Sequence, residues 1–478
     1  MTITAEILGA HEDIAPVPAE RRTLSTFGIG VLWGDLGVGL LVLVAGSLLV
    51  PGLGLRDALI AAAVGSVIGS ALLALAGRVG SDTGVPTMVA LRPSLGIRGS
   101  YVASVLNIGQ LVGWAGLEII IMAQASRAIS DEFFGFDGYY LWLTLFALIG
   151  TALAVGGPVV VVRQFLQRFG FWIVLAATVW LTWRLFATYH VQDLLDDGGA
   201  GGFPNFWQGV DIAVALPVSW LPLVADYSRY ARSAKAAAWS TFISYSLANT
   251  WFFALGAGYV LVLSANPGNL IGVLVDSMLT LALGWLFLAV ILADETDNAF
   301  ANIYSTAVSL QNLVRIGHRT LAVAVGIAAF VLAVSVDLLG YETFLLLIGG
   351  VFVSLFGVML ADYFIVHAGR YETPELYTRG GRYWFRGGVN PAGLLAWFAG
   401  FCTYIACAQP PWVLEHFPSV ADIPANANDW TGLDITAVGG TIPSFAVSLA
   451  LYLVLERAFR RRGVAAGSQA ADGAQPPA

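Results

Sequence analysis

One acidic residue, Glu118, lies near the middle of a long apolar stretch and follows Trp114 by four residues. A carboxylate at that depth in hydrocarbon is costly, so a chain keeps one there to bind a ligand, to carry a proton or as half of a buried structural pair. The i, i+4 spacing puts the indole and the carboxyl on one face of a helix. An apolar ring beside a hydrogen-bonding acid suits a planar heterocycle, so we expect this pair to bind a ligand or move a proton.

Three more acids, Asp294, Glu295 and Asp297, fall within four residues of another apolar stretch. They cannot all face one way on a helix, and close carboxyls cannot all be ionised without a cation. Either Na⁺ or shared protons would relieve their repulsion, while one or two could instead cap a helix break or face a neighbouring helix. Asp35, in the first apolar stretch, either approaches the same cation or accepts hydrogen bonds from free backbone amides.

The composition is that of a polytopic membrane protein. Of the 478 residues, 58% are hydrophobic and 11% are charged, whereas soluble domains carry about 25% charged residues. We therefore expect the lipid bilayer to surround the chain and no nucleic acid to be a partner. The sequence contains no phosphate-binding glycine-rich loop with lysine and no nucleophile elbow, so we expect no enzyme activity and no cofactor beyond a coupling Na⁺ or H⁺.

Twelve segments are long and apolar enough to cross a membrane, which takes about 20 residues each. Their approximate limits are 24–50, 55–78, 99–126, 139–162, 168–189, 209–228, 236–263, 275–305, 319–337, 341–367, 391–411 and 436–457. Of the 23 basic residues, 20 precede the first span or follow an even-numbered one. The positive-inside rule then places both termini in the cytoplasm. We expect an inner-membrane protein whose ends, 1–23 and 458–478, are disordered.

The first and sixth spans are interrupted. Residues 33–39 contain three glycines and an acid, and Pro217 and Pro222 lie five residues apart. Backbone unwinds at membrane depth where it lines a cavity, and paired breaks in two halves are typical of inverted-repeat transporters with a midplane site. We therefore predict an all-α membrane fold with two five-helix repeats. The predicted parts are repeats 24–189 and 209–367 and two further helices within 391–457.

Four local strings are spread over spans two to eleven. They are residues 84–96 with 98–100, residues 106–114, residues 220–230, and residues 361–364 with 383–390. Together they resemble the nucleobase:cation symporter-1 family, the purine and cytosine permeases. The resemblance implies a LeuT-like core of five plus five inverted-repeat helices with two C-terminal helices, alternating access, and cation-driven uptake of bases or related heterocycles.

The resemblance also implies a substrate site. Family members stack the substrate on side chains of spans three and six, and they place a polar side chain one turn after the span-three aromatic. Span six adds a hydroxyl and span eight adds hydrogen-bonding side chains. The implied substrate-binding residues here are Trp114, Glu118, Ser219, Trp220, Asp297 and Asn298.

A coupling site is implied in the same way. Sodium-coupled members hold the ion between the unwound first span and two adjacent hydroxyl residues of span eight. Those two positions fall here on Asp294 and Glu295, or with a small shift on Thr296, so Na⁺ and H⁺ both stay open. The implied coupling residues are Gly34, Asp35, Asp294, Glu295 and Thr296, with Asp294 and Thr296 as the pair nearest a Na⁺ ion.

We therefore expect a secondary active importer of a nucleobase or related planar heterocycle. The alternatives are a thiamine-precursor pyrimidine, allantoin or a hydantoin on the same fold, and, outside transport, a membrane enzyme. An ionised Glu118 accepts from two adjacent N–H donors, whereas cytosine presents an acceptor beside its amine and would need the protonated acid. The oligomeric state is left open, and a monomer is consistent with the sequence.

Overall fold

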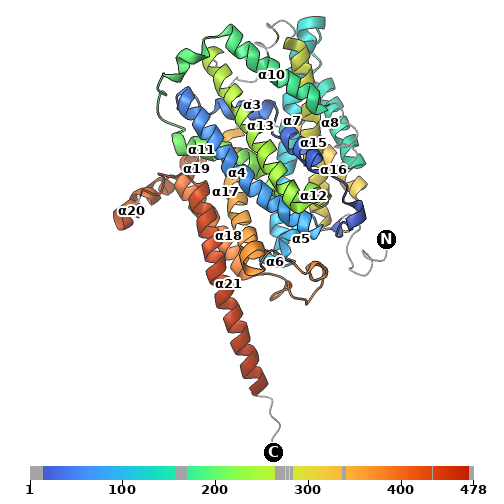
Figure 1. Ribbon diagram of the computed structural model, residues 1–478, viewed down its shortest axis with the longest axis vertical. Coiled ribbons are helices and arrows are strands. Elements are labelled where there is room, and N and C mark those ends of the chain that lie inside the picture. Colours follow the sequence, from blue (N-terminus) through green and yellow to red (C-terminus); the bar gives the residue numbers. More distant parts are fainter. Residues whose placement is uncertain are drawn as a thin grey trace, which may run out of the picture. The chain divides into compact units, whose positions relative to one another are not determined.

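The computed structural model describes residues 14–157, 170–263, 275, 279, 284–335, 341–432 and 434–472. Regular structure in these residues is helical, apart from two isolated β-bridges (Figure 1). The long helices are α4 (Leu55–Thr83), α7 (Ser100–Phe134), α8 (Tyr139–Gly156), α10 (Phe171–Thr188), α13 (Ala234–Leu263), α15 (Gly284–Gln311), α16 (His318–Ser335), α17 (Tyr341–Leu360), α18 (Pro391–Ala408) and α21 (Thr441–Asp472). The broken spans are α2 (Thr26–Asp35) with α3 (Leu40–Ser47), and α11 (Phe206–Ser219) with the 3₁₀ turn η5 (Leu221–Leu223) and α12 (Val224–Ser228).

The chain is a multi-pass membrane protein. Within the described residues, ten helical segments are long and apolar enough to cross a membrane, or eleven if the bent pair α2 and α3 is one span. The predicted eighth span, 275–305, overlaps α15, which stands outside this set because three acids interrupt its apolar character; residues 276–278 and 280–283 lie outside the described residues. The all-helical fold is confirmed, while the count of twelve spans stays a prediction.

Both predicted helix interruptions are present. The first span bends by 57° between α2 and α3, and Gly39 precedes α3 with a φ of +155° that favours glycine. The sixth span changes from α11 to a 3₁₀ turn at Leu221 and then resumes as α12. Pro222 contributes to this change because its ring nitrogen cannot donate to the preceding turn.

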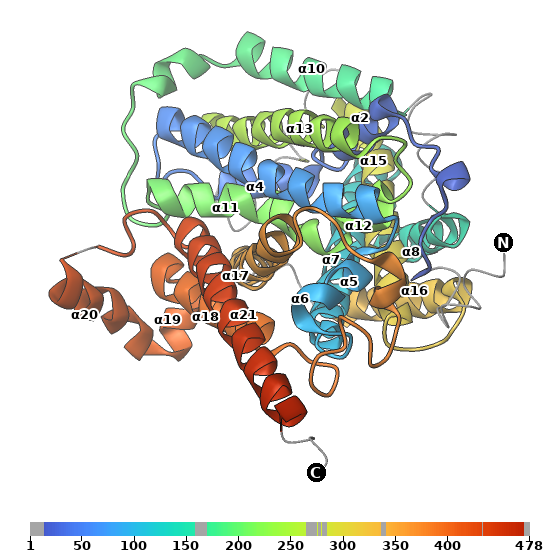
Figure 2. The same cartoon turned by 60° about the horizontal axis from the view of Figure 1, so that its bottom comes forward.

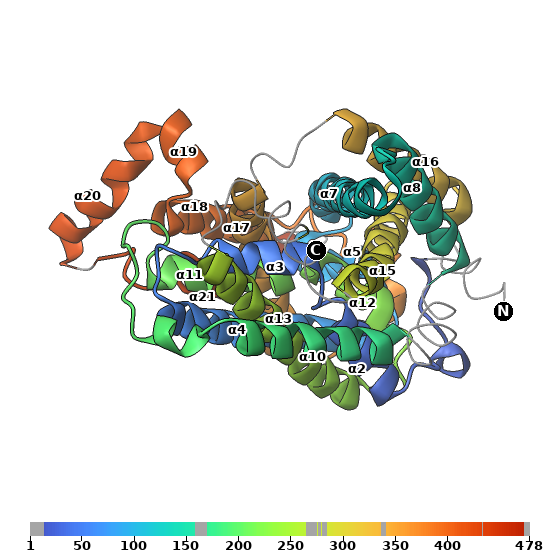
Figure 3. The ribbon, with the colours of Figure 1, turned by 90° about the horizontal axis from the view of Figure 1, so that it is seen from above.

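The chain divides into two compact units, 1–90 with 101–349 and 91–100 with 350–478. In the first unit α4 packs between α11 and α13, as Figure 2 shows, and α13 also contacts α2 and α3. Figure 3 shows α10 lying along α13 and α2. On another side of this unit α8 packs against α15 and α16. The broken first span is thereby placed beside α13.

The second unit is centred on a pair formed by α18 and α21. Near it, a π-helical segment, η7 (Ala361–Val366), carries the fully buried Asp362. Its carboxylate accepts hydrogen bonds from the hydroxyls of Tyr371 at 2.7 Å and Tyr452 at 2.6 Å, and His367 Nδ1 lies 3.2 Å away. These contacts tie α21 and the loop after η7 to one carboxylate.

Parts of both ends for which disorder was predicted, residues 14–23 and 458–472, lie within the described residues. Residues 14–23 lie against the end of α4, where Val17 N donates to Gly84 O at 2.8 Å and Arg22 Nη1 donates to Ser81 O at 2.8 Å. Burial of Ile14 and Val17 explains why this segment is ordered. At the other end α21 continues to Asp472, because the arginines and alanines after 457 are good helix formers. Residues 1–13 and 473–478 lie outside the described residues.

Candidate substrate and cation site

A small buried cavity of about 20 Å³ lies where the break between α2 and α3 meets α7, α11 and α15. Its lining comprises Leu36, Val38, Gly39, Leu41, Val42, Trp114, Glu118, Leu216, Ser219, Trp220, Glu295, Asn298 and Asn302. Five of the six residues predicted to bind substrate are therefore brought together from three helices. The sixth, Asp297, is not among the lining residues.

The two predicted aromatic residues are buried at this cavity and held by other rings. Trp114 and Trp220 are 5% and 7% exposed. The ring of Trp114 meets Phe344 edge-on with centroids 5.2 Å apart, and Trp220 meets Trp33 in the same manner at 6.3 Å. Edge-to-face contacts of this kind favour one ring orientation, so neighbouring rings hold both indoles at the cavity wall.

Glu118 and Glu295 face each other across the cavity. Their carboxyl groups lie within hydrogen-bonding reach of one another, and Glu118 Oε2 has no hydrogen-bond partner among the described residues. Glu295, by contrast, accepts hydrogen bonds from the backbone amide of Leu40 and from Asn298 Nδ2 at 3.2 Å. Glu295 therefore caps the start of α3, whose positive dipole end favours an anion, while the described residues provide no comparable donor for Glu118 Oε2.

Gly39 allows this capping contact. A Cβ atom at position 39 would lie 2.7 Å from Glu295 Oε1, closer than a side chain can approach. Its φ of +155° is also one that other residues rarely adopt. The glycine is therefore required both by the backbone turn and by the closeness of the carboxylate.

Two amides on α7 support the broken sixth span. Gln110 Nε2 donates to the backbone carbonyl of Ser219 at 3.0 Å and to Asn107 Oδ1 at 2.8 Å, and Asn107 Nδ2 donates to Ser309 Oγ at 2.8 Å. A carbonyl released where a helix breaks needs such a partner in a membrane. We did not predict these residues, although their spacing to Trp114 places them on the same helical face.

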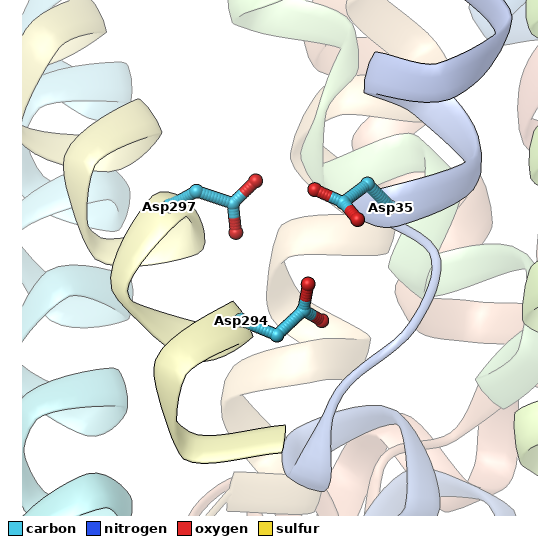
Figure 4. Close-up of side chains that lie close together, drawn as sticks. All are labelled: Asp35, Asp294 and Asp297. Atoms are coloured by element: carbon cyan, nitrogen blue, oxygen red, sulfur yellow. The ribbon is translucent and has the colours of Figure 1, made fainter. Parts of the chain in front are cut away.

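A second buried group consists of Asp35, Asp294 and Asp297 (Figure 4). One carboxylate oxygen from each lies within 4.8 Å of the others, and the side chains are 1%, 5% and 3% exposed. Figure 4 shows Asp35, at the end of α2, pointing toward the two acids of α15. Both oxygens of Asp35 and Asp297 and one of Asp294 have no hydrogen-bond partner among the described residues. Such a group needs a cation or protons to offset its charge.

The structure separates the acids of α15 by helical face. Asp294 and Asp297 are three residues apart and face α2, whereas Glu295 shares the cavity face with Asn298 and Asn302. Glu295 thus lines the cavity, whereas Asp297 lies with Asp35 and Asp294. Thr296 is on neither face: it is partly exposed, and its hydroxyl donates to Ala293 O at 2.6 Å.

Gly34 also lies apart from the carboxylate group. It lines a larger apolar cavity of about 680 Å³ between α2, α10 and α13, with Asp35 as part of the wall. Of the predicted coupling residues, Asp35 and Asp294 belong to the three-carboxylate group. Asp297 completes it.

Comparisons with known proteins show the family to which the chain is similar. The family model described as permease for cytosine/purines, uracil, thiamine, allantoin matches residues 16–423. Cytosine permease of Escherichia coli (strain K12) is 25% identical over 338 residues, which are 68% of this chain and 74% of that protein. Hydantoin permease of Microbacterium maritypicum is 24% identical over 394 residues, 79% of this chain and 80% of that one. Allantoin permease of Bacillus subtilis is 23% identical over 426 residues, 82% and 86% of the two chains.

Solved structures share the fold. Mhp1, a nucleobase-cation-symport-1 family transporter in a closed conformation with bromovinylhydantoin bound, matches with a TM-score of 0.77 and 20% identity over 93% of this chain and 95% of that one. A Na⁺-coupled sialic acid symporter matches with a TM-score of 0.51 and 13% identity, covering 90% and 97% of the two chains. At these identities the likeness concerns the arrangement of helices alone.

Proposed function

The chain belongs to the family of permeases for cytosine/purines, uracil, thiamine and allantoin, and on that premise we propose that it imports a planar heterocycle across the cell membrane by cation-coupled alternating access. Family membership makes it a nucleobase-type transporter and points away from an enzyme. The direction of transport, the substrate and the coupling ion are the parts that we propose.

One observation carries the proposal: Trp114, Glu118, Ser219, Trp220 and Asn298 converge on a single buried cavity beside an unwound span. Two indoles supply flat apolar surfaces, and the carboxyl, hydroxyl and amide supply hydrogen bonds that orient a ring. Irregular backbone at membrane depth is tolerated where it lines such a site. The same combination is expected of a midplane substrate site.

The size of the cavity supports alternating access. Ligand pockets are typically about 300–1,000 Å³, whereas this cavity is about 20 Å³. A heterocycle therefore requires the lining helices to separate. Because the α2–α3 break and the first turn of α3 together contribute five of the lining residues, opening at this break would admit the ligand.

We place the coupling cation at Asp35, Asp294 and Asp297. A Na⁺ ion carries one charge, so it cannot balance three neighbouring carboxylates alone, and protons must neutralise part of the group in either case. Oxygen ligands suit both a hard cation and shared protons. We therefore propose that protons participate in coupling, with or without Na⁺.

We also propose the organisation that the sequence predicts: repeats 24–189 and 209–367, two further helices within 391–457, and cytoplasmic termini. The breaks in the first and sixth spans support the pairing of the repeats. The asymmetry of basic residues supports the orientation.

Counterflow in proteoliposomes tests the function. Vesicles loaded with unlabelled heterocycle should take up the same labelled compound transiently, for at least one of cytosine, uracil, guanine, hypoxanthine, a hydantoin, allantoin and a thiamine-precursor pyrimidine. Protein-free vesicles provide the control. Chemical conversion without exchange would instead indicate a membrane enzyme, and neither exchange nor conversion of any compound would refute the proposal.

A further inference from the structure

The polar wall of the substrate cavity offers acceptors rather than charged donors. Among the described residues, its lining includes two glutamates and no lysine, arginine or histidine. Glu118 is 4% exposed and Asn298 is 3% exposed. Glu118 Oε2 and Asn298 Oδ1 are both without a hydrogen-bond partner in the described part of the chain. Buried acceptors without partners are costly, and N–H groups on a ligand would satisfy these two.

Two donors on the wall are already directed at protein acceptors. The hydroxyl of Ser219 donates to Leu216 O at 2.6 Å, and Asn298 Nδ2 donates to Glu295 Oε2 at 3.2 Å. A ligand carbonyl facing this side would therefore compete with bonds that exist within the protein. A ligand amine would complete bonds that the protein leaves unmade.

The second glutamate places another acceptor carboxyl beside the first. Glu295 is held by the amide of Leu40 and by Asn298, and its carboxyl lies within reach of that of Glu118. Two carboxyls so close need a proton or donor groups between them. Two adjacent N–H groups match the two oxygens of a carboxylate, so they can satisfy Glu118 while reducing its repulsion with Glu295.

We propose that the cavity selects heterocycles with an amino group beside a ring N–H, the pattern of guanine and isocytosine, over oxo or unsubstituted analogues of the same size. The inference rests on the proposed function and narrows its substrate class. Glu118 is the residue that accepts from the donor pair, and Glu295 is the acceptor, held in place by Leu40 and Asn298, that disfavours a carbonyl there. Hypoxanthine and uracil lack the exocyclic amine and leave one Glu118 oxygen unpaired.

The test measures how strongly unlabelled ligands inhibit counterflow of a labelled compound. Guanine is compared with hypoxanthine, and isocytosine is compared with uracil. Loss of one hydrogen bond to a charged group weakens binding by about 10- to 150-fold, and we expect the amino member of each pair to bind more tightly by that factor. Glu118→Gln replaces one acceptor by a donor. It should bring the ratio of the two affinities in each pair, amino member over its analogue, to near one or invert it.

Glu456→Gln is the matched control, because Glu456 is also 4% exposed and accepts from Asn390 in the other unit. It should leave the ratio unchanged. Equal or tighter binding of hypoxanthine and uracil by the unaltered protein overturns the inference, and this comparison needs no variant to fold. In that case exchange of any heterocycle still supports the proposed function, whereas absence of exchange for every compound refutes both. A ratio that persists in Glu118→Gln overturns the role given to Glu118.

Discussion

The carboxylate of Glu295 caps the backbone amide of Leu40, and this contact joins α15 to the start of α3 in the broken first span. A buried carboxylate at a helix N-terminus satisfies a free amide and faces the positive end of the helix dipole. The same side chain lines the proposed substrate cavity beside Glu118. A change in the cavity can therefore reach the unwound segment through one residue.

Gly39→Ala should abolish transport and lower thermal stability. The new methyl would meet Glu295 Oε1 at 2.7 Å on a backbone with φ of +155°, so either the cap or the turn must shift. Gly109→Ala is the control, because no atom lies within 4 Å of the added Cβ in α7 and alanine is the better helix former by about 0.5–1 kcal/mol. Thermal unfolding measures the stability of both variants, and counterflow measures their transport. Wild-type uptake by Gly39→Ala would contradict the role of the cap.

Trp114→Ala should weaken substrate binding while the protein still folds. Stacking of a base on an aromatic side chain is worth about 1–3 kcal/mol by alanine substitution, or about 5- to 150-fold in affinity. Trp114→Phe should recover most of the affinity. Trp239→Ala serves as the comparison, since Trp239 is 58% exposed on α13. Equal substrate affinity in the Trp114→Ala and Trp239→Ala proteins would rule out stacking at Trp114.

Asp297→Asn should uncouple transport from the cation gradient. The substitution removes one of three mutually close carboxyls, so the group no longer needs the same charge compensation. Uphill uptake driven by an inward proton gradient, with and without Na⁺, should disappear while downhill exchange persists. Asp57→Asn, at an exposed position in the first turn of α4, should retain uphill uptake. Gradient-driven accumulation by Asp297→Asn equal to that of the wild type would exclude this residue from coupling.

Tyr452→Phe should destabilise the second unit without changing substrate selectivity. The hydroxyl donates to Asp362 at 2.6 Å, and loss of one partner of a buried carboxylate costs about 1–3 kcal/mol. Thermal unfolding in detergent gives the stability, and the competition profile of the folded fraction gives selectivity. Unchanged stability would show that Tyr371 and His367 satisfy Asp362 without Tyr452.

The sequence predicted the parts of the site that rest on helical periodicity and missed those that rest on contacts between helices. Trp114 and Glu118 could be placed on one face from their spacing alone. The assignment of Glu295 and Asp297 depended on how α15 is rotated about its axis, which only packing decides. The requirement for Gly39 follows from a contact with a residue more than 250 positions away, so no local pattern could reveal it.

The breaks in the two discontinuous spans were predictable because glycine and proline act locally. The hydrogen bond from Gln110 to the backbone carbonyl of Ser219 was not predictable. That carbonyl becomes available only where the sixth span unwinds. Similarly, the order of residues 14–23 depends on the surface of α4, and nothing in that short segment specifies a partner.

A structure of the protein with an exchanged heterocycle bound tests the central claim most directly. We expect the ring in an enlarged cavity, against the indoles of Trp114 and Trp220 and within hydrogen-bonding distance of Glu118. A ligand bound elsewhere, with this cavity still closed, would contradict the assignment of the substrate site.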